Sequence, residues 1–289
     1  MLNIIMLANK YKIIEKIKEG SFGIIFKGEN VRTSDLVAIK FEPKDIDKKT
    51  LKNEAKIYQY FGRIDGFPQL KWFGTNENNN YLVMDLLGVS LSEMINYYKA
   101  FCLKTVLRLG VQIIKRIQIL HERFLLHRDI KPDNFLFGLG KATNKLHLID
   151  FGISKRYDYD GVHISEAKIH KLIGTPNFVS LNVHNGIEPS RRDDLESCIY
   201  IIINMLFGEL EWFNKKNTDE IYDLKYKLQF IDEVPSFIKI MLYYVRNMKF
   251  EETPDYEYII NLMVKVFNEN NFKNDEKYEW AKKIEYIKM

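Results

Sequence analysis

The stretch HRDIKPDNFLFG, residues 127–138, combines residue types whose spacing suits chemistry at a phosphate group. Asp129 can accept the proton of an incoming hydroxyl, and Lys131 can neutralise charge that develops on a transferred phosphoryl group. Asn134 can offer an amide oxygen to a hard cation such as Mg²⁺. A charged run with a proline between apolar segments is ordinarily a solvated loop, so this motif needs support from the rest of the chain.

Two later features supply part of that support. A short apolar strand expected at 146–149 leads into Asp150-Phe151-Gly152, in which the carboxylate provides a second metal ligand and the ring packs behind it. Further along, Thr175 places a hydroxyl where it can bridge the aspartate and lysine of the first motif. The intervening segment is basic, and it is either a solvated loop or a patch that favours acidic or phosphorylated peptides.

The elements before this region contain a glycine turn. Two strands expected at 11–18 and 24–29 are joined by the turn EGSFG, whose glycines let the backbone approach phosphate oxygens. A plain hairpin explains the same pattern, and Lys18 stands where a G-x-G-x-x-G motif has its first glycine.

Two charged residues interrupt apolar patterns. Lys40 lies in the strand LVAIKF (36–41), and Glu54 falls on the apolar face of a helix expected at 47–61. Burying either charge alone is unfavourable, although each has an ordinary explanation as a surface residue. Together they predict an ion pair that holds a lysine in place for the α- and β-phosphates of a nucleotide.

The remaining pattern provides the scaffold. Gly88 is the expected hinge after the smaller lobe, and Ser90 with Glu93 forms a capping box that predicts a helix start. A helix expected to begin at 191 has acidic residues in its first turn and is apolar on all sides from 198 to 207, which places it at a domain centre. The other expected elements are strands at 70–73 and 81–85 and an amphipathic helix at 105–121.

Composition describes an ordinary globular protein of 289 residues, with 46% hydrophobic and 28% charged residues. The net charge of +4 is too mild to indicate a nucleic-acid ligand. Two distant cysteines indicate neither a disulfide framework nor a zinc site. The apolar N-terminal stretch is short and lacks a preceding basic region, so we expect no signal peptide and no membrane span.

With these motifs in order, the chain from about Tyr11 resembles the eukaryotic protein kinases, and in detail the casein kinase 1 family. The strings that carry this resemblance are HRDIKPDNFLFGLGK (127–141), MDLLG (84–88), GT (174–175), SLNVH (180–184), GIEPSRRDDLESCIY (186–200) and PDY (254–256).

The resemblance implies an α+β, two-lobed protein-kinase fold that transfers the γ-phosphoryl group of ATP, with Mg²⁺, to serine or threonine. The small lobe would be a mainly antiparallel sheet with one key helix, and the larger lobe mainly helical. The implied division is an N-terminal extension at 1–10, an N-lobe at 11–87 and a C-lobe at 88–289.

Motif positions imply the site residues. Asp129 would be the base, assisted by Lys131 and Thr175, with Asn134 and Asp150 as the metal ligands. Asp194 would hold the backbone of the catalytic loop. The nucleotide-binding residues would be Ile17, Gly20, Ser21, Gly23, Ile25, Ala38, Lys40, Glu54, Met84 as gatekeeper, Asp85, Leu87, Leu136 and Ile149.

Three departures from the family pattern bear on substrate choice and regulation. Lys18 replaces a loop glycine, Asn177 stands where the family has a phosphate-recognising arginine, and the stretch between Trp212 and Pro235 is short. The preference for acidic or primed substrates is therefore left open. We expect that this protein lacks the long C-terminal regulatory tail of many family members, and that its activity does not require phosphorylation of the activation loop.

Expected partners are protein substrates, and we expect a monomer within the cell, in the cytoplasm, the nucleus or both. Two alternatives compete with an active kinase. A nucleotide-binding pseudokinase scaffold would normally lack one of the five essential residues, all of which are present. An enzyme resembling the vaccinia-related kinases is disfavoured by Arg128 and Asp193.

Overall fold

The computed structural model describes residues 6–20, 23–45, 49–275 and 277–280. The chain forms two compact units. The first comprises Met1–Gly88 together with Leu136–Ile153, and the second comprises Val89–Phe135 together with Ser154–Met289. A segment from the middle of the chain thus belongs with the N-terminal unit.

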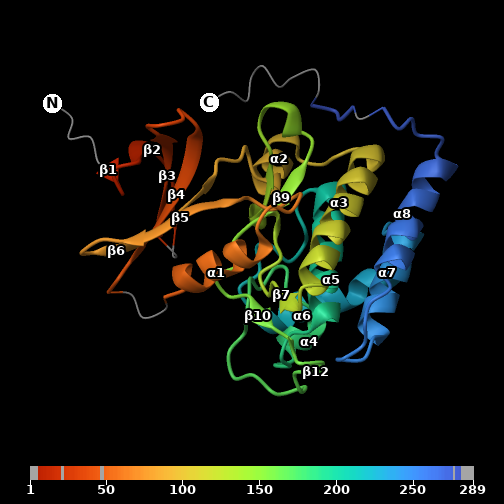
Figure 1. Cartoon of the computed structure of the whole chain (residues 1–289). Coiled ribbons are helices and arrows are strands. Elements are labelled where there is room, and N and C mark those ends of the chain that lie inside the picture. Colours follow the sequence, from red (N-terminus) through yellow and green to blue (C-terminus); the bar gives the residue numbers. More distant parts are fainter. Residues whose placement is uncertain (1–5, 21–22, 46–48, 276, 281–289) are drawn as a thin grey trace. The chain divides into compact units, whose positions relative to one another are not determined.

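A six-stranded sheet dominates the first unit (Figure 1). All neighbouring strands pair antiparallel, in the order β1-β2-β3-β4-β6-β5. The strands are β1 (Met6–Leu7), β2 (Tyr11–Gly20), β3 (Gly23–Asn30), β4 (Leu36–Pro43), β5 (Leu70–Thr75) and β6 (Asn79–Asp85).

One helix accompanies this sheet. We expected it to begin near Asp47, but α1 spans Leu51–Phe61, and residues 46–48 lie outside the described part of the chain. The buried carboxylate of Glu42 explains the observed start, because its Oε1 accepts hydrogen bonds from the main-chain N–H groups of Thr50 (2.6 Å) and Leu51 (2.8 Å). An anion at this end also suits the helix dipole.

The segment Leu136–Ile153 adds a small hairpin-like sheet of β8 (Phe135–Phe137) and β9 (Leu146–Leu148). It is attached to the loop after α1, where the N–H of Leu148 donates to the carbonyl of Gly66 at 2.9 Å. An ion pair between Lys145 and Asp65 at 2.6 Å adds a second connection. The loop after β9 therefore has a defined position relative to α1.

The second unit is mainly helical. Its helices are α2 (Leu91–Tyr98), α3 (Leu103–His121), α4 (Leu181–His184), α5 (Arg191–Phe207), α6 (Thr218–Lys227), α7 (Ser236–Asn247) and α8 (Tyr256–Glu269). Short strands pair within it: β7 (Leu125–Leu126) with β10 (Lys155–Arg156), and β11 (Asp158–Tyr159) with β12 (Val162–His163). The capping box of Ser90 and Glu93 at the start of α2 is confirmed.

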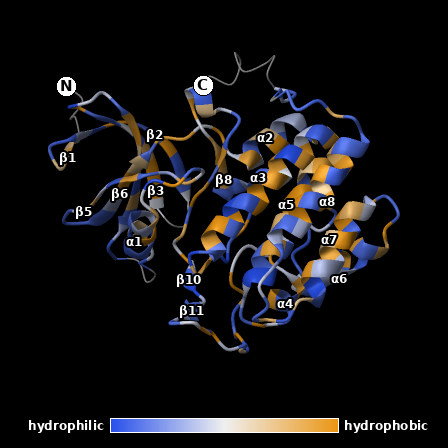
Figure 2. Cartoon of the chain, turned by 45° about the vertical axis from the view of Figure 1, so that its right-hand side comes forward, coloured by the Kyte–Doolittle hydropathy of each residue, from blue (hydrophilic) through white to orange (hydrophobic). Residues whose placement is uncertain are grey.

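Helix α5 occupies the centre of this unit, as its apolar stretch 198–207 predicted. Every residue from Arg191 to Met205 is buried, and α5 packs against α3 and α7 while α3 also contacts α8 (Figure 1). Hydrophobic and hydrophilic residues alternate along α3, α7 and α8 (Figure 2). The predicted α+β fold is confirmed. Among the described residues, no helix is long and apolar enough to cross a membrane.

Candidate active site

The side chains on the two faces of β4 have different surroundings. Val37, Ile39 and Phe41 point to one face, where they join an apolar core with Tyr81 and Val83. Because side chains alternate along a strand, Ala38 and Lys40 must point to the other face.

Sheet register identifies the neighbours of Ala38 and Lys40. Ala38 lies opposite Met84 of β6, and Lys40 lies opposite Ile25 of β3 and Leu82 of β6. Directly opposed residues share a face, so these five side chains belong to one surface of the sheet.

Lys40 makes the ion pair predicted with Glu54. Its Nζ lies 2.8 Å from Oε2 of Glu54 and 3.1 Å from Oδ1 of Asp150. Burial alone lowers the pKa of Lys40, but the two carboxylates outweigh it and raise the pKa above its usual value. The lysine is therefore a fixed cation on the sheet surface, which is the property that phosphate binding requires.

The predicted nucleotide-binding residues all belong to the first unit. Ala38 and Met84 are buried, whereas Ile17 is 51% exposed. The remaining apolar positions are partly buried: Ile25, Leu87, Leu136 and Ile149. Asp85 is engaged with the protein, since its carboxylate accepts from the N–H of Gln69 at 2.8 Å and pairs with Lys71 at 2.8 Å.

The glycine turn between β2 and β3 is partly described. Ser21 lies outside the described residues, while Gly20 pairs with Gly23 across the hairpin. Gly23 has a φ of +123°, and a Cβ there would lie 1.8 Å from the carbonyl oxygen of Phe41. Only glycine fits this position, because both the backbone conformation and the close approach of β4 exclude a side chain.

Asp150 and Phe151 occupy a strained, well-packed turn after β9. Asp150 has a φ of +67°, unusual for a residue with a side chain, and its N–H donates to the hydroxyl of Tyr58 at 3.2 Å. Phe151 is fully buried, with ring centroids 5.1 Å from Tyr58 and 5.3 Å from Phe61. Aromatic packing thus fixes the turn that presents the Asp150 carboxylate beside Lys40.

In the second unit, Asp129, Lys131 and Thr175 form a triangle of hydrogen bonds. Lys131 Nζ donates to Asp129 Oδ2 at 2.7 Å and to Thr175 Oγ1 at 3.2 Å, and Thr175 Oγ1 donates to Asp129 Oδ1 at 2.6 Å. The bridging position predicted for Thr175 is therefore present. An ionised carboxylate held beside a cation and a hydroxyl can receive a proton from an alcohol and keep the adjacent charge balanced.

Asn134 lies on the 3₁₀ turn η1 (Pro132–Asn134), close to Asp129 in the same unit. Its Nδ2 donates to the carbonyl of Asp129 at 2.8 Å. This bond directs the amide nitrogen toward the loop and leaves the amide oxygen, the atom that could bind Mg²⁺, directed away from it.

The donor chemistry fits Mg²⁺ rather than a transition metal. Asp150 and Asn134 offer oxygen ligands, and the described residues contain no group of three or more His, Cys, Asp or Glu side chains able to hold a metal by themselves. Mg²⁺ commonly takes only one or two protein oxygens and completes its coordination with substrate phosphates and water.

Asp194 at the start of α5 fixes the backbone around Asp129, as predicted. Its Oδ2 accepts from the N–H of His127 at 2.7 Å and its Oδ1 accepts from the N–H of Arg128 at 3.0 Å. Arg128 has a φ of +68°, so this loop needs such anchoring to persist.

His121 completes this anchor and was missed in the sequence. Its Nε2 lies 3.0 Å from Asp194 Oδ2 and its Nδ1 lies 2.7 Å from the hydroxyl of Tyr256. Burial lowers the pKa of His121, so the ring is neutral at pH 7, donating to Asp194 and accepting from Tyr256. Burial alone raises the pKa of Asp194, but its donors, led by His121, hold that pKa below the usual value.

Glu188 is a second residue to which the sequence assigned no role. Its Oε1 lies 2.9 Å from Lys155 Nζ and 3.4 Å from Arg128 Nη1. Glu188 follows the segment 150–175 in the chain, and its carboxylate pairs with one lysine of that segment, Lys155, and with Arg128 beside Asp129. Part of the predicted basic patch is thereby neutralised within the protein itself.

Lys225 of α6 is a third residue to which the sequence assigned no role. It is fully buried, and its Nζ donates to the carbonyl oxygens of Pro176 (2.8 Å) and Val179 (2.7 Å). A lysine in the polar sequence TDEIYDLKYK gives no sign of this position, because the acceptors belong to a distant segment.

A comparison with protein families agrees with this geometry. The family model described as protein kinase domain matches residues 11–274. The match extends over most of both compact units and includes every site residue discussed above.

Proposed function

Since this chain belongs to the protein kinase family, we propose that it is an active serine/threonine kinase of the casein kinase 1 type. It would transfer the γ-phosphoryl group of ATP to hydroxyls of protein substrates. The observation that carries the proposal is the triangle of Asp129, Lys131 and Thr175, which is built for proton removal from an alcohol beside a phosphoryl group. The subfamily rests on the resemblance of the string GIEPSRRDDLESCIY.

In this mechanism each residue has one task. Asp129 accepts the proton of the substrate hydroxyl, and Lys131 offsets charge on the transferred group. Lys40, held by Glu54, binds the α- and β-phosphates. Asn134 and Asp150 would hold Mg²⁺, which when bound neutralises phosphate charge.

We also propose that activity does not require phosphorylation of the segment between Asp150 and Thr175. In kinases switched on in this way, the added phosphate orders the segment by pairing with arginine. Here the Glu188 carboxylate already pairs with Arg128 and Lys155. A permanent anion in this place supports constitutive order of the loop.

The preference for primed substrates is proposed to be weak. Asn177 replaces a cationic side chain, and Lys225 is engaged with main-chain oxygens in the interior. Neither position offers a charge to a substrate phosphate. Monomeric action inside the cell, in the cytoplasm, the nucleus or both, belongs to the same proposal and rests on the family resemblance.

The test is phosphate transfer from labelled ATP with Mg²⁺ to casein and to matched serine, threonine and tyrosine peptides, primed and unprimed. We expect transfer to serine and threonine, a primed-to-unprimed ratio near one, and loss of activity in Asp129→Asn. Wild-type protein that binds ATP but phosphorylates neither these substrates nor itself would refute the enzyme and favour a pseudokinase scaffold. Transfer confined to tyrosine would refute the serine/threonine assignment.

A further inference from the structure

The chain returns to the second unit after its last helix. Helix α8 ends at Glu269, and residues 275 and 277–280 then lie against α3 without forming a helix or a strand. These residues follow the end of the protein kinase match at residue 274. We call residues 275 and 277–280 the strap.

Three side chains of α3, spaced four residues apart, hold the strap from one face of the helix. Lys104 Nζ pairs with Asp275 Oδ1 at 2.7 Å. The guanidinium of Arg108 lies 4.3 Å from the centroid of the Tyr278 ring, and Gln112 Nε2 donates to the hydroxyl of Tyr278 at 3.0 Å. Tyr278 is buried, so the strap is packed into the unit.

The end of the strap contacts the junction between α2 and α3. The side chain of Trp280 is 2% exposed, and its ring centroid lies 5.6 Å from that of Phe101 and 6.2 Å from that of Tyr98. Glu279 Oε1 accepts from the N–H of Cys102, the N-cap residue of α3, at 3.0 Å. The strap therefore packs on the last residue of α2 and on the start of α3.

Helix α2 depends on such contacts, because it has only eight residues. Helices of this length are marginal without tertiary packing. Its start is held by the capping box of Ser90 and Glu93. Its end is less favourable, since the C-cap residue Lys99 has a φ of +69°. The ring of Trp280 packs on both sides of Lys99 in the sequence, against Tyr98 and Phe101.

Helix α2 in turn packs against the 3₁₀ turn η1, which contains Asn134. A turn of three residues takes its position from its neighbours. Asn134 is buried there, and its Nδ2 donates to the carbonyl of Asp129 at 2.8 Å. A continuous series of contacts thus leads from Trp280 through α2 to a proposed ligand of Mg²⁺.

We propose that Trp280 is a positioning residue, which holds α2 and thereby the turn that bears Asn134. The consequence for Mg²⁺ rests on the proposed function of Asn134, whereas the contacts from Trp280 to η1 do not. Mg²⁺ demands near-ideal octahedral geometry, so a displaced amide oxygen binds it less well. Loss of the Trp280 ring should therefore raise the Mg²⁺ concentration that the enzyme requires.

The first test is hydrogen–deuterium exchange of the full chain, which does not depend on enzyme activity. Trp280→Ala removes a buried ring and leaves space that neighbouring residues fill only in part. We expect faster exchange in peptides that cover α2 and in peptides that cover η1, because local opening of packed elements exposes their amides. Trp280→Phe keeps an aromatic ring and should restore slow exchange at both places.

The second test is phosphate transfer to casein over a range of Mg²⁺ concentrations. We expect the half-saturating Mg²⁺ concentration to rise about 10-fold in Trp280→Ala, the lower end of the effect of residues that orient metal ligands. At saturating Mg²⁺ the kcat should largely recover, and Trp280→Phe should resemble the wild type. A loss of stability alone would lower the amount of active enzyme without changing its Mg²⁺ requirement.

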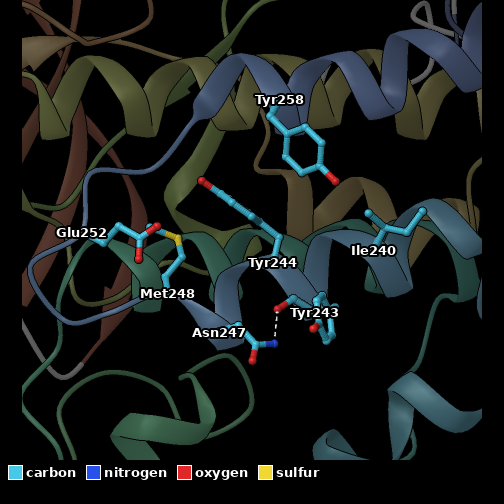
Figure 3. A pocket seen from close by; sticks show the side chains of 7 residues that line it. All are labelled: Ile240, Tyr243, Tyr244, Asn247, Met248, Glu252 and Tyr258. Atoms are coloured by element: carbon cyan, nitrogen blue, oxygen red, sulfur yellow. Dashed lines mark hydrogen bonds between the residues drawn. The ribbon is translucent and has the colours of Figure 1, made fainter.

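The matched control removes a ring that packs between two other helices of the same unit. Tyr244 of α7 lies beside Tyr258 of α8 in a hollow of about 300 Å³ (Figure 3). Their ring centroids are 5.2 Å apart, and the hydroxyl of Tyr244 accepts from the N–H of Asp255 at 2.7 Å. Tyr244→Ala should therefore loosen α7 and α8 while exchange at α2 and η1, and the Mg²⁺ requirement, stay as in the wild type.

The proposal is overturned if Trp280→Ala leaves exchange at η1 unchanged, or if Tyr244→Ala accelerates it equally. An active Trp280→Ala variant with an unchanged Mg²⁺ requirement would overturn it as well. If thermal melting shows that Trp280→Ala does not fold, Trp280→Leu, which keeps an apolar side chain without the ring, takes its place in both tests. Wild-type protein without phosphate transfer would contradict the proposed function, and the exchange comparison would still decide whether Trp280 holds η1.

Discussion

Replacing Asp194 by asparagine tests whether this residue positions the catalytic loop. The carboxylate accepts two main-chain N–H groups, those of His127 and Arg128, and a third hydrogen bond from His121. The amide of asparagine has only one acceptor oxygen. Its other terminal atom is an NH₂ group, a donor, which would lie against an N–H donor that the carboxylate now accepts from. Hydrogen bonds to a charged group contribute about 1.5–3 kcal/mol each, so the expected destabilisation is about 2–4 kcal/mol.

The functional effect should be larger than the loss of stability explains. The loop released by Asp194→Asn contains Asp129, and a displacement of about 1 Å at a reacting group costs about 100-fold in rate. Urea unfolding should show a midpoint lower by about 1–2 M for a slope near 2 kcal/mol per M. We expect kcat for casein to fall about 100-fold under conditions where the variant is fully folded.

Asp193→Asn is the matched control. Asp193 is as buried as its neighbour, at 3% exposure for each residue, but it accepts from Ser180 and from the N–H of Ser190 instead of the catalytic loop. It should lose stability by a similar amount and keep most of its kcat. Equal losses of kcat in both variants, or full kcat in Asp194→Asn, would show that the hydrogen bonds of Asp194 do not position Asp129.

Three further predictions concern charged groups. Glu54→Gln removes the strongest partner of Lys40, so kcat/KM for ATP should fall about 10- to 100-fold in steady-state assays, and an unchanged value would refute the orienting role. Glu188→Gln removes the internal anion, so activity of unphosphorylated protein should fall several-fold, whereas a variant as active as wild type would contradict our account of loop order. For His184, burial and the ammonium of Lys225 at 3.1 Å lower the pKa from 6.5 to about 4. As pH falls, the imidazole of His184 is therefore protonated in the unfolded chain before it is protonated in the folded protein. The contribution of neutral His184 to the free energy of unfolding is complete above pH 6.5 and is lost as the pH approaches 4. Urea midpoints should show the stability of wild type relative to His184→Gln falling across that window, and a constant difference would refute the shift.

The ion pair of the site could be predicted because each of its members is a charged residue in an otherwise apolar pattern. Lys40 stands in an apolar strand and Glu54 on an apolar helix face, and each conflict is resolved by the other across the fold. Strand alternation likewise predicts that Ala38 and Lys40 share a face, because the side-chain period of a strand is fixed by backbone geometry. Thr175 was predicted from the pair Gly174-Thr175 after the basic segment, and not from a local conflict in the pattern.

The residues that were missed lack any such local conflict. Tyr58 fits an apolar helical stripe by its ring, and only its hydroxyl, bonded to the N–H of Asp150, reveals a second task. His121 ends a long amphipathic helix, where a polar residue is unremarkable. Lys225 lies in a polar helix and is buried because carbonyls of a distant segment need a donor. In each case the partner is remote in sequence, and periodicity identifies a face but not what meets it.

Glu188 shows how such a remote partner changes the functional argument. From the sequence, Lys155 and its neighbours were equally compatible with a mobile loop and with a patch for acidic peptides. The structure places a carboxylate against Lys155 and Arg128, so part of that positive charge is balanced within the chain. A phosphate that reached this position would have to displace an anion already paired there. The same contact that supports activity without loop phosphorylation therefore also argues against strong selection of phosphorylated substrates at this place.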